Sequence, residues 1–540
     1  MVIRPLIAIV LAAIALAAPA PSFAQSERGS ITGVIQDTSK AAVPGVSVKV
    51  VNTATNSTTD VVSSESGAYS AVNLPPGTYR IEASLTGFQT AKTDGIRLAA
   101  GATARVDIVL NLGAIEETVT VMANSPLVST EDAKITTNMS NESIDQLPLV
   151  VAGAMRSVFD LVATVPESKG SGAQVVIGGG QGGGFGATLD GISVNTNRAA
   201  DTAETAFLTP SVEAITEFAV ETNGFKPEFG QAAGGAITFA SKSGTNAFHG
   251  SVYNFLRNDA LDRKGFFEAQ KGIYRQNNYG ASWGGPVQIP HLYEGKNRTF
   301  FFAAFEGFQN RSASNALTLS VPTPEMYNGD FSNWVDSQGR RLIIYDPATT
   351  RPNSSGAGFI RDPFPGNIIP AARFSAVAKQ YIALARSAVV PNRAGLVPGT
   401  LGYVSNNFLS PGGTTREATN KYSVKIDHSL SNTQRLSYLF NRGNNRLQPG
   451  DSGPAGLPLP FNVFQSSSFD ADLHRATWDW IGSRMVNHLT FGVNTFNKDA
   501  YSPNVGQDWK SQICIPNAVD CNVNMGAIVF GTNSTEFSTW

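Results

Sequence analysis

Apolar and polar residues alternate along several short segments in the first fifth of the chain. The segments 46–50, 79–85 and 105–110 place apolar residues at every second position, with polar residues between them. Alternation of this kind is typical of β-strands that bury one face. Turn sequences rich in proline and glycine, such as 74–79, separate the segments. The pattern therefore predicts a small antiparallel β-sandwich over residues 25–112.

Longer strands with the same alternation follow toward the end of the chain. Residues 421–427 alternate polar side chains with tyrosine, valine and isoleucine, and 435–441 and 489–493 repeat the pattern. One face of such strands suits lipid and the other an aqueous lumen, with Trp478 and Trp480 fitting an interfacial belt. A soluble protein of two packed sheets gives the same alternation. The alternation alone therefore leaves a transmembrane barrel and a soluble sandwich open.

The segments between these strand regions lack regular alternation. Residues 125–245 contain two short helical patterns, at 142–147 and 156–164, and a glycine-dense tract at 178–186. This mixture predicts an α+β domain. From about 309 to 419, prolines and glycines are frequent and no alternation is clear, which predicts a long surface loop with some local structure.

The composition narrows the classes of protein that fit these patterns. Charged residues make up 15% of the 540 residues, aromatic residues 9%, and the formal net charge is −2. Ordinary soluble domains carry about 25% charged residues, so the low value favours strand-rich or lipid-facing structure. The small net charge argues against a nucleic-acid-binding surface, and no nucleic-acid partner is expected.

The first 24 residues have the pattern of a signal peptide. Arg4 precedes the apolar run 6–18, which is followed by two prolines and the small-x-small sequence Ser-Phe-Ala at 22–24. The alternative, a membrane anchor, needs a run of about 20 apolar residues, and this run is shorter. We therefore expect residues 1–24 to be removed on export.

Two cysteines, Cys514 and Cys521, lie near the end of the sequence. In an exported protein they would meet an oxidising compartment, where a pair at this spacing closes a small loop. A structural disulfide is the favoured interpretation, and a metal-binding or redox pair is the alternative.

Short motifs add family resemblances to these patterns. The sequences Ala-Val-Pro-Gly at 42–45, Glu-Ser-Gly-Ala-Tyr at 65–69 and Leu-Pro-Pro-Gly-Thr-Tyr at 74–79 resemble the carboxypeptidase regulatory-like domain, a transthyretin-like sandwich. Such modules usually have accessory roles. Motifs of the middle region look like the plug of TonB-dependent outer-membrane receptors, and those after it are similar to the Oar-like branch of that family. The plug-like motifs lie at 178–186, 188–195, 212–218 and 228–235, and the Oar-like ones at 241–262 and 296–302.

The resemblance implies a mainly β protein with three parts after the signal peptide and a linker. These are the sandwich, a plug over 125–245 and, over 246–540, the N-terminal part of a large antiparallel transmembrane barrel. A plugged barrel of about 22 strands needs roughly 220 residues in strands alone. With the long loop subtracted, 246–540 holds too few. We therefore expect an incomplete barrel and a C-terminally truncated sequence.

The linker 113–124 contains the candidate binding segment, a β-prone run between the sandwich and the plug. An exposed strand of this kind can be captured by strand addition to a partner's sheet. The run resembles the TonB box of the family, although the same residues also fit an ordinary strand. Its residues are Glu117, Thr118, Val119, Thr120 and Val121.

The resemblance implies uptake of a siderophore, oligosaccharide or peptide by plug displacement, without cofactor or catalytic residues. The partners would be TonB with the ExbB–ExbD inner-membrane motor, outer-membrane lipid and an extracellular solute. The location would be the outer membrane, with the sandwich in the periplasm. The alternative is a non-transporting surface, carbohydrate-binding or adhesion protein on the same scaffold. A secreted zinc peptidase using His291, Glu294 and His428 is disfavoured, because the His-x-x-Glu motif falls in a turn between strands.

Overall fold

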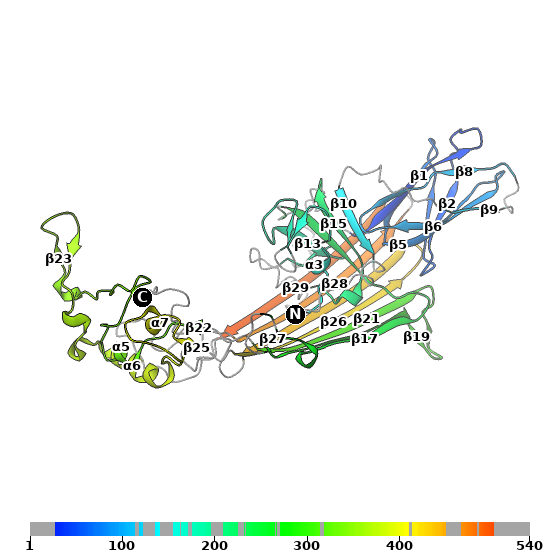
Figure 1. The fold of residues 1–540 in the computed structure, drawn as a ribbon. Helices are drawn as coiled ribbons and strands as arrows, with labels where there is room; N and C mark the ends of the chain where they lie inside the picture. Colours follow the sequence, from blue (N-terminus) through cyan, green and yellow to red (C-terminus); the bar gives the residue numbers. More distant parts are fainter. Residues whose placement is uncertain are drawn as a thin grey trace, which may run out of the picture.

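The computed structural model places three bodies along one long β-sheet. A sandwich lies at one end of the sheet, an inner domain lies against one face, and an insertion lies at the other end (Figure 1). The expected signal peptide, the helix expected at 142–147 and both cysteines lie outside the described residues. The described residues are 27–113, 118–122, 135–140, 155–162, 164–170, 175–195, 209–224, 232, 234–264, 266, 271–313, 318–409, 413–449, 466–482 and 485–501.

The sandwich consists of two sheets that enclose an apolar core, as the alternation predicts. One sheet has the order β4-β1-β7, with β8 also paired to β1, and the other has the order β3-β2-β5-β6-β9. Val48, Val50, Ile81 and Ile108 of the alternating segments are buried between them. The strands are β1 (Gly29–Asp37), β2 (Ser47–Asn52), β3 (Thr58–Val62), β4 (Ala68–Leu74), β5 (Gly77–Ser84), β6 (Thr90–Leu98), β7 (Thr103–Arg105), β8 (Ile108–Leu110) and β9 (Thr118–Met122).

The inner domain is built on a five-stranded sheet with the order β10-β15-β16-β13-β14. Its elements are β10 (Ile135–Ser140), α3 (Phe159–Val162), β11 (Ser168–Lys169), β12 (Val176–Ile177), β13 (Phe185–Leu189), β14 (Ile192–Ser193), the 3₁₀ turn η2 (Val212–Ala214), β15 (Ile215–Asn223) and β16 (Gly235–Ser241). The helix expected at 156–164 is therefore a single turn. Its neighbours Thr164 and Val165 already lie in turns that lead to β11.

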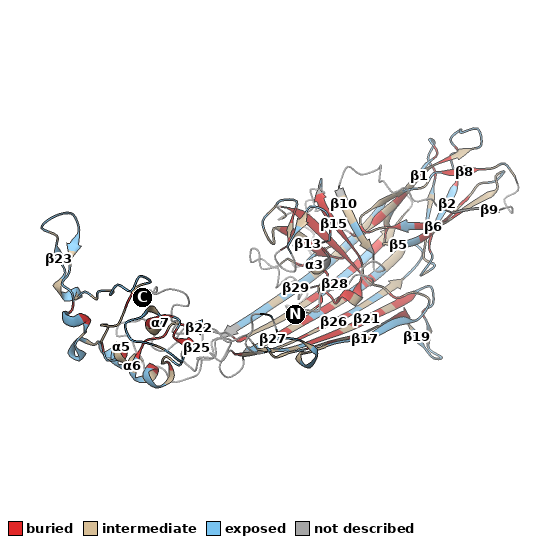
Figure 2. Cartoon of the chain, viewed as in Figure 1, coloured by how far each residue is buried: buried red, intermediate tan, exposed pale blue. Residues whose placement is uncertain are grey.

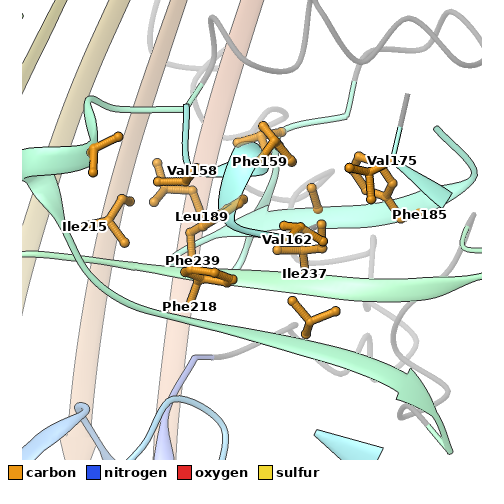
Figure 3. Close-up of a cluster of buried hydrophobic side chains, with 14 of the residues drawn as sticks. Val158, Phe159, Val162, Val175, Phe185, Leu189, Ile215, Phe218, Ile237 and Phe239 are labelled. Atoms are coloured by element: carbon orange, nitrogen blue, oxygen red, sulfur yellow. The ribbon is translucent and has the colours of Figure 1, made fainter. Parts of the chain in front are cut away.

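Aromatic and branched side chains form the core of the inner domain (Figure 3). Phe159 of α3 packs edge-on against Phe239 of β16, with ring centroids 5.4 Å apart. The same cluster includes Leu439 and Leu473 from the long sheet. The inner domain therefore shares its core with the long sheet instead of closing on itself.

The long sheet has seven antiparallel strands in sequence order, and among the described strands β17 and β29 are its edges. They are β17 (His249–Asn258), β18 (Tyr274–Pro286), β21 (Thr299–Ala313), β26 (Thr414–Ser429), β27 (Gln434–Pro449), β28 (Ser466–Ile481) and β29 (Val486–Tyr501). A 3₁₀ turn, η3 (Asp259–Leu261), follows β17, and a small hairpin, β19 (Gln288–Ile289) with β20 (Tyr293–Glu294), joins β18 to β21.

The two faces of the long sheet differ in burial (Figure 2). We call the face against the inner domain the inward face, and it buries Glu306, Lys421 and Ser423. The outward face exposes apolar side chains, among them Val424 and Phe491. The alternation read from the sequence is therefore confirmed. In the described part of the chain, no helix is long and apolar enough to cross a membrane.

The insertion between β21 and β26 is a folded unit. The flanking strands run to Ala313 and from Thr414, so the segment is shorter than the expected 309–419. Tyr327 and Val389 belong to its core, and β22 pairs with β25 at its base. Its elements are β22 (Thr318–Leu319), α5 (Pro324–Tyr327), η4 (Pro347–Thr349), β23 (Arg351–Pro352), β24 (Phe359–Ile360), η5 (Pro365–Asn367), η6 (Ala371–Arg373), α6 (Ala376–Ala388), α7 (Leu401–Val404) and β25 (Phe408–Leu409).

Candidate functional site

The candidate binding segment forms β9, the last strand of the larger sandwich sheet. It runs parallel to β6, in a register from Thr90 opposite Thr118 to Asp94 opposite Met122. Four of the five predicted residues, Thr118 to Val121, lie in this strand, and Glu117 lies outside the described residues. The sandwich sheet therefore extends beyond the expected boundary at residue 112.

Among the described strands, β9 has a partner on one side. Among the described strands β6 is its sole partner, so the other edge of β9 forms the margin of the sheet. An unpaired strand margin presents backbone N–H and C=O groups that a further strand can bind. The sequence predicts that the segment is an exposed strand between two domains. In the structure, one of its edges is already paired with β6 of the sandwich.

A buried ion pair fixes the sandwich to the end of the long sheet. Arg28 Nη2 lies 3.2 Å from Asp479 Oδ2 of β28, and Asn73 Nδ2 donates to the other carboxylate oxygen at 2.9 Å. Burial alone would lower the pKa of the Arg28 guanidinium, but Asp479 and Glu27 raise it above its ordinary value. Both charges of the pair therefore persist in this junction.

A second contact of the junction involves β27. Arg435 donates from Nη2 to the backbone oxygen of Thr58 at 3.0 Å, at the start of β3. Residues of three bodies, including Arg28, Asp190 and Lys425, line a cavity of about 260 Å³ beside it. The junction thus brings the sandwich, the inner domain and the long sheet together at one place.

Asp190 makes a buried polar contact between the inner domain and the long sheet. Its carboxylate lies 3.5 Å from Lys425 Nζ and 3.4 Å from Arg475 Nη1, and the Ser241 backbone N–H donates to it at 2.9 Å. Burial opposes ionisation, but the two cations outweigh it and lower the pKa of Asp190 to about 2. The group is therefore a permanent carboxylate that attaches the inner domain to two strands.

The local sequence explains why Asp190 reaches this position. Asp190 and Gly191 connect β13 to β14, and both have positive φ, 45° and 84°. An Asp-Gly pair is the preferred sequence for such a tight hairpin turn. The turn places the carboxylate at the end of the hairpin, facing the long sheet.

Arg156 provides another charged contact across the same interface. Its guanidinium lies 3.4 Å from Glu306 of β21 and 3.4 Å from Glu213 of the inner domain. It also stacks over the ring of Tyr253, 4.4 Å from the centroid. Because Glu306 is fully buried, this pairing avoids an isolated charge in the interior.

One carboxylate couples the sandwich directly to the inner domain. Glu217 of β15 accepts a hydrogen bond from the Ala100 backbone N–H of the sandwich at 3.1 Å. Burial raises the pKa of Glu217 to about 7. This contact therefore changes its charge near neutral pH, whereas Asp190 does not.

Sequence reasoning proposed the candidate binding segment but none of these contacts. The alternation did place Lys425 on the polar side of its strand, which is the inward face. The signal that could have predicted these contacts is the presence of charged residues on the polar face of the strands. Charged side chains that become buried on such a face require partners from another part of the chain. The residues of the disfavoured zinc motif lie elsewhere: His291 is in a turn with φ 61°, and His428 Nδ1 is 2.7 Å from Thr299 Oγ1.

Comparisons with known proteins identify two regions. The family model described as "Outer membrane beta barrel domain" matches residues 240–539, and "Carboxypeptidase regulatory-like domain" matches residues 30–111. The TonB-dependent transporter Oar of Myxococcus xanthus is 29% identical over 317 residues, covering 55% of this chain and 28% of that protein. The chain thus spans less than a third of the length of this curated relative.

Solved structures give partial matches. A mutant form of the ferric enterobactin receptor of Pseudomonas aeruginosa, in complex with enterobactin, matches with a TM-score of 0.37 and 11% identity, over 67% of this chain and 41% of that chain. A streptococcal ancillary pilin matches 16% of this chain and 33% of its own, with a TM-score of 0.14 and 15% identity.

Two observations point to the same location for the chain. The long sheet has an outward face that suits lipid, and the outer membrane barrel family model matches more than half of the sequence. The chain is mostly β, carries a carboxypeptidase regulatory-like sandwich, and is located in the outer membrane. It belongs to the outer membrane β-barrel family.

Proposed function

We propose that the chain is part of a TonB-dependent transporter, in which residues 117–121 bind TonB. The observation that carries the proposal is β9, the last strand of the sandwich sheet, which pairs only with β6 among the described strands and precedes the inner domain in the sequence. The similarity to the Oar transporter supports it. The domains would be the signal peptide 1–24, the sandwich 25–112, the linker 113–124, the plug 125–245 and the barrel from 246.

The path of the chain explains how a pull on β9 would reach the inner domain. Residues 123–134 connect β9 to β10, which is the edge strand of the inner-domain sheet and pairs only with β15 among the described strands. TonB would bind β9 by strand pairing, which loads several backbone hydrogen bonds together. Force from the ExbB–ExbD motor would then pull on β10. As an edge strand, β10 can detach from the sheet while the pairing of the other strands stays intact.

The charged contacts of the inner domain set the resistance to this pull. Asp190 is held by Lys425 and Arg475, and Arg156 by Glu306. Moving the inner domain separates these pairs, and a buried charge without its partner costs about 3–5 kcal/mol. The plug would therefore stay in place until TonB supplies mechanical work.

The orientation follows from the same arrangement. The sandwich and β9 would lie in the periplasm, where TonB is accessible. The insertion, at the other end of the sheet, would lie on the extracellular side (Figure 1). A siderophore, oligosaccharide or peptide would bind on that outer side. Transport of this type requires no covalent chemistry, so we infer that the protein is not an enzyme.

The test is binding to the purified periplasmic domain of TonB. Val119→Pro removes a backbone donor and prevents ladder pairing, so affinity should fall at least tenfold, or about 1.4 kcal/mol. Val119→Thr is the matched control, because it keeps the donor and the β-branched shape, and its affinity should stay close to that of the unmodified protein. Equal affinity of the proline variant and the unmodified protein would refute the TonB-binding role of β9.

A further inference from the structure

Three arginines lie side by side on the outward face of the long sheet. Arg275 of β18 is opposite Arg311 of β21, and Arg311 is opposite Arg416 of β26. Residues directly opposite in antiparallel strands point to the same side of the sheet. The three side chains, which we call the arginine row, therefore form one line across three neighbouring strands, and all three residues are exposed.

The face of the arginine row follows from contacts of the same strands. Glu306 of β21 and Lys425 of β26 touch the inner domain, so they define the inward face. Side chains alternate between faces along a strand, and Arg311 and Arg416 are an odd number of positions from these residues. Both arginines therefore point outward, away from the lumen side.

The position along the strands places the row beyond the apolar surface. On the outward face of β26, Tyr422, Val424 and Ile426 are exposed, and Arg416 lies six positions further toward the insertion. Six residues of strand correspond to on the order of 20 Å. The row thus lies at the end opposite the sandwich, above a surface that suits lipid chains.

The charges of the row are incompletely balanced within the protein. Arg275 Nε lies 3.2 Å from Asp259, whereas the described residues provide no ion pair for Arg311 or Arg416. Like charges directly opposite in a sheet are destabilising. On the same face Arg446, which lines the same end of the sheet, pairs with Asp470, and Arg442 pairs with Asp472, so among these arginines the described residues leave Arg311 and Arg416 without an ion pair.

A hollow accompanies the row. A cavity of about 440 Å³ is lined by residues at this end of the sheet. The lining includes all three arginines of the row together with Arg446, Gln309 and Gln448, whose side chains all carry N–H groups. These groups are hydrogen-bond donors. If the acyl chains of a lipid lay on the apolar surface, the headgroup of that lipid would lie next to these donors.

We propose that the arginine row binds the phosphate of a lipid headgroup in the outer leaflet of the membrane. Guanidinium groups bind phosphate through paired N–H donors, and a phosphate between Arg311 and Arg416 would remove their repulsion. A lipid is the occupant because the row continues the lipid-facing surface and faces away from the lumen. The choice of the outer leaflet rests on the orientation proposed above, whereas the phosphate-binding chemistry of the row does not depend on TonB.

The experiment measures binding of bisphosphorylated lipid A by the full chain, purified from outer membranes in a nonionic detergent. The unmodified protein is compared with Arg311→Gln/Arg416→Gln. The matched control is Arg340→Gln/Arg361→Gln, which removes two exposed positive charges from the insertion. Lipid A without phosphates and inorganic phosphate serve as further probes.

We expect affinity for bisphosphorylated lipid A to fall at least tenfold in the row variant and to change less than twofold in the control. Without lipid, the row variant should melt no earlier than the unmodified protein, because repulsion is relieved. Equal affinity of the row variant and the unmodified protein would overturn the proposal. Equal binding of lipid A with and without phosphates, or displacement by millimolar inorganic phosphate, would also overturn it.

Discussion

Arg28 and Asp479 form an ion pair 3.2 Å long although 451 positions separate them in the sequence. One residue belongs to the start of the sandwich and the other to β28 of the long sheet. Both side chains are almost completely shielded, with exposed fractions of 10% and 4%. The sandwich is therefore attached to the sheet by a specific buried contact and not by a loose linker.

Replacing Asp479 with asparagine should loosen this attachment. Arg28 would keep Glu27, 3.2 Å away, but would lose the carboxylate that crosses between the two bodies. Removing one partner of a buried pair costs about 3–5 kcal/mol. Hydrogen–deuterium exchange should show faster exchange in β1 and in the adjoining ends of β28 and β29.

The control for this prediction is Asp472→Asn on the same strand. Asp472 pairs with Arg442 at the exposed outward face, where an ion pair contributes at most about 1 kcal/mol. Exchange in β1 should not change in this variant. Equal effects of the two substitutions would show that the buried pair has no special role in docking.

Asp190→Asn should weaken the hold of the long sheet on the inner domain at every pH above about 4. The folded pKa of Asp190, about 2, lies below the ordinary value of 3.8. The stabilisation is thus present above 3.8 and is lost as the pH falls through about 2. At pH 6, hydrogen–deuterium exchange of the β16 amides should be faster in this variant than in the unmodified protein. In the unmodified protein, the exchange rate of these amides, corrected for the intrinsic rate, should not change between pH 5 and 8.

Glu167→Gln is the matched control, because Glu167 is an exposed carboxylate of the same domain. It should leave the exchange of β16 unchanged. If Asp190→Asn also left it unchanged, the charges of Lys425 and Arg475 would not hold the inner domain.

Glu217 should make the contact between the sandwich and the inner domain sensitive to pH. Its folded pKa is raised to about 7 from 4.5, so stability is full below about pH 4.5 and is lost as the pH rises through 7. Exchange of the Ala100 amide, corrected for its intrinsic rate, should therefore accelerate between pH 5 and 8. Glu217→Gln keeps the acceptor oxygen and should abolish the pH dependence, and a persistent dependence would assign it to another group.

Sequence patterns predicted the strands well because one-sided burial leaves a local trace. Residues such as Val424 and Ile426 alternate with polar neighbours, and the structure places them on the outward face. Contacts that join distant segments leave no such trace. The pairing of Asp190 with Arg475 depends on how the inner domain meets the long sheet, and the pairing of β9 with β6 depends on how the sandwich folds as a whole.

The helix expected over 156–164 shows a different limit. Its apolar spacing fits a helix, but only Phe159–Val162 form one, as α3. Phe159 and Val162 are anchored in the core of the inner domain, and Ser168 donates to the Val162 and Val165 carbonyl oxygens. Tertiary contacts and this side-chain hydrogen bonding therefore take the place of further helical turns.

Asn407→Ala should destabilise the insertion by about 2–4 kcal/mol, because truncation leaves buried backbone groups unpaired. The Asn407 carboxamide is fully buried, accepts from the Val321 backbone N–H and donates to the backbone oxygens of Val321 and Tyr403. Hydrogen–deuterium exchange under mild urea should show earlier opening of the insertion, with exposed Gln338→Ala as an unaffected control. Equal protection in both variants would contradict the prediction.

The pairing of β22 with β25 has a consequence for how the long sheet assembles. Thr318 and Leu409 are register partners, so the two ends of the insertion are adjacent in space. If the insertion folds first, the loop-closure entropy for joining β21 to β26 depends only on the few residues between these strands and the β22–β25 pair. The β21–β26 hairpin can therefore form with the kinetics of a short connection, and changes in the length of the insertion leave the register of these two strands untouched.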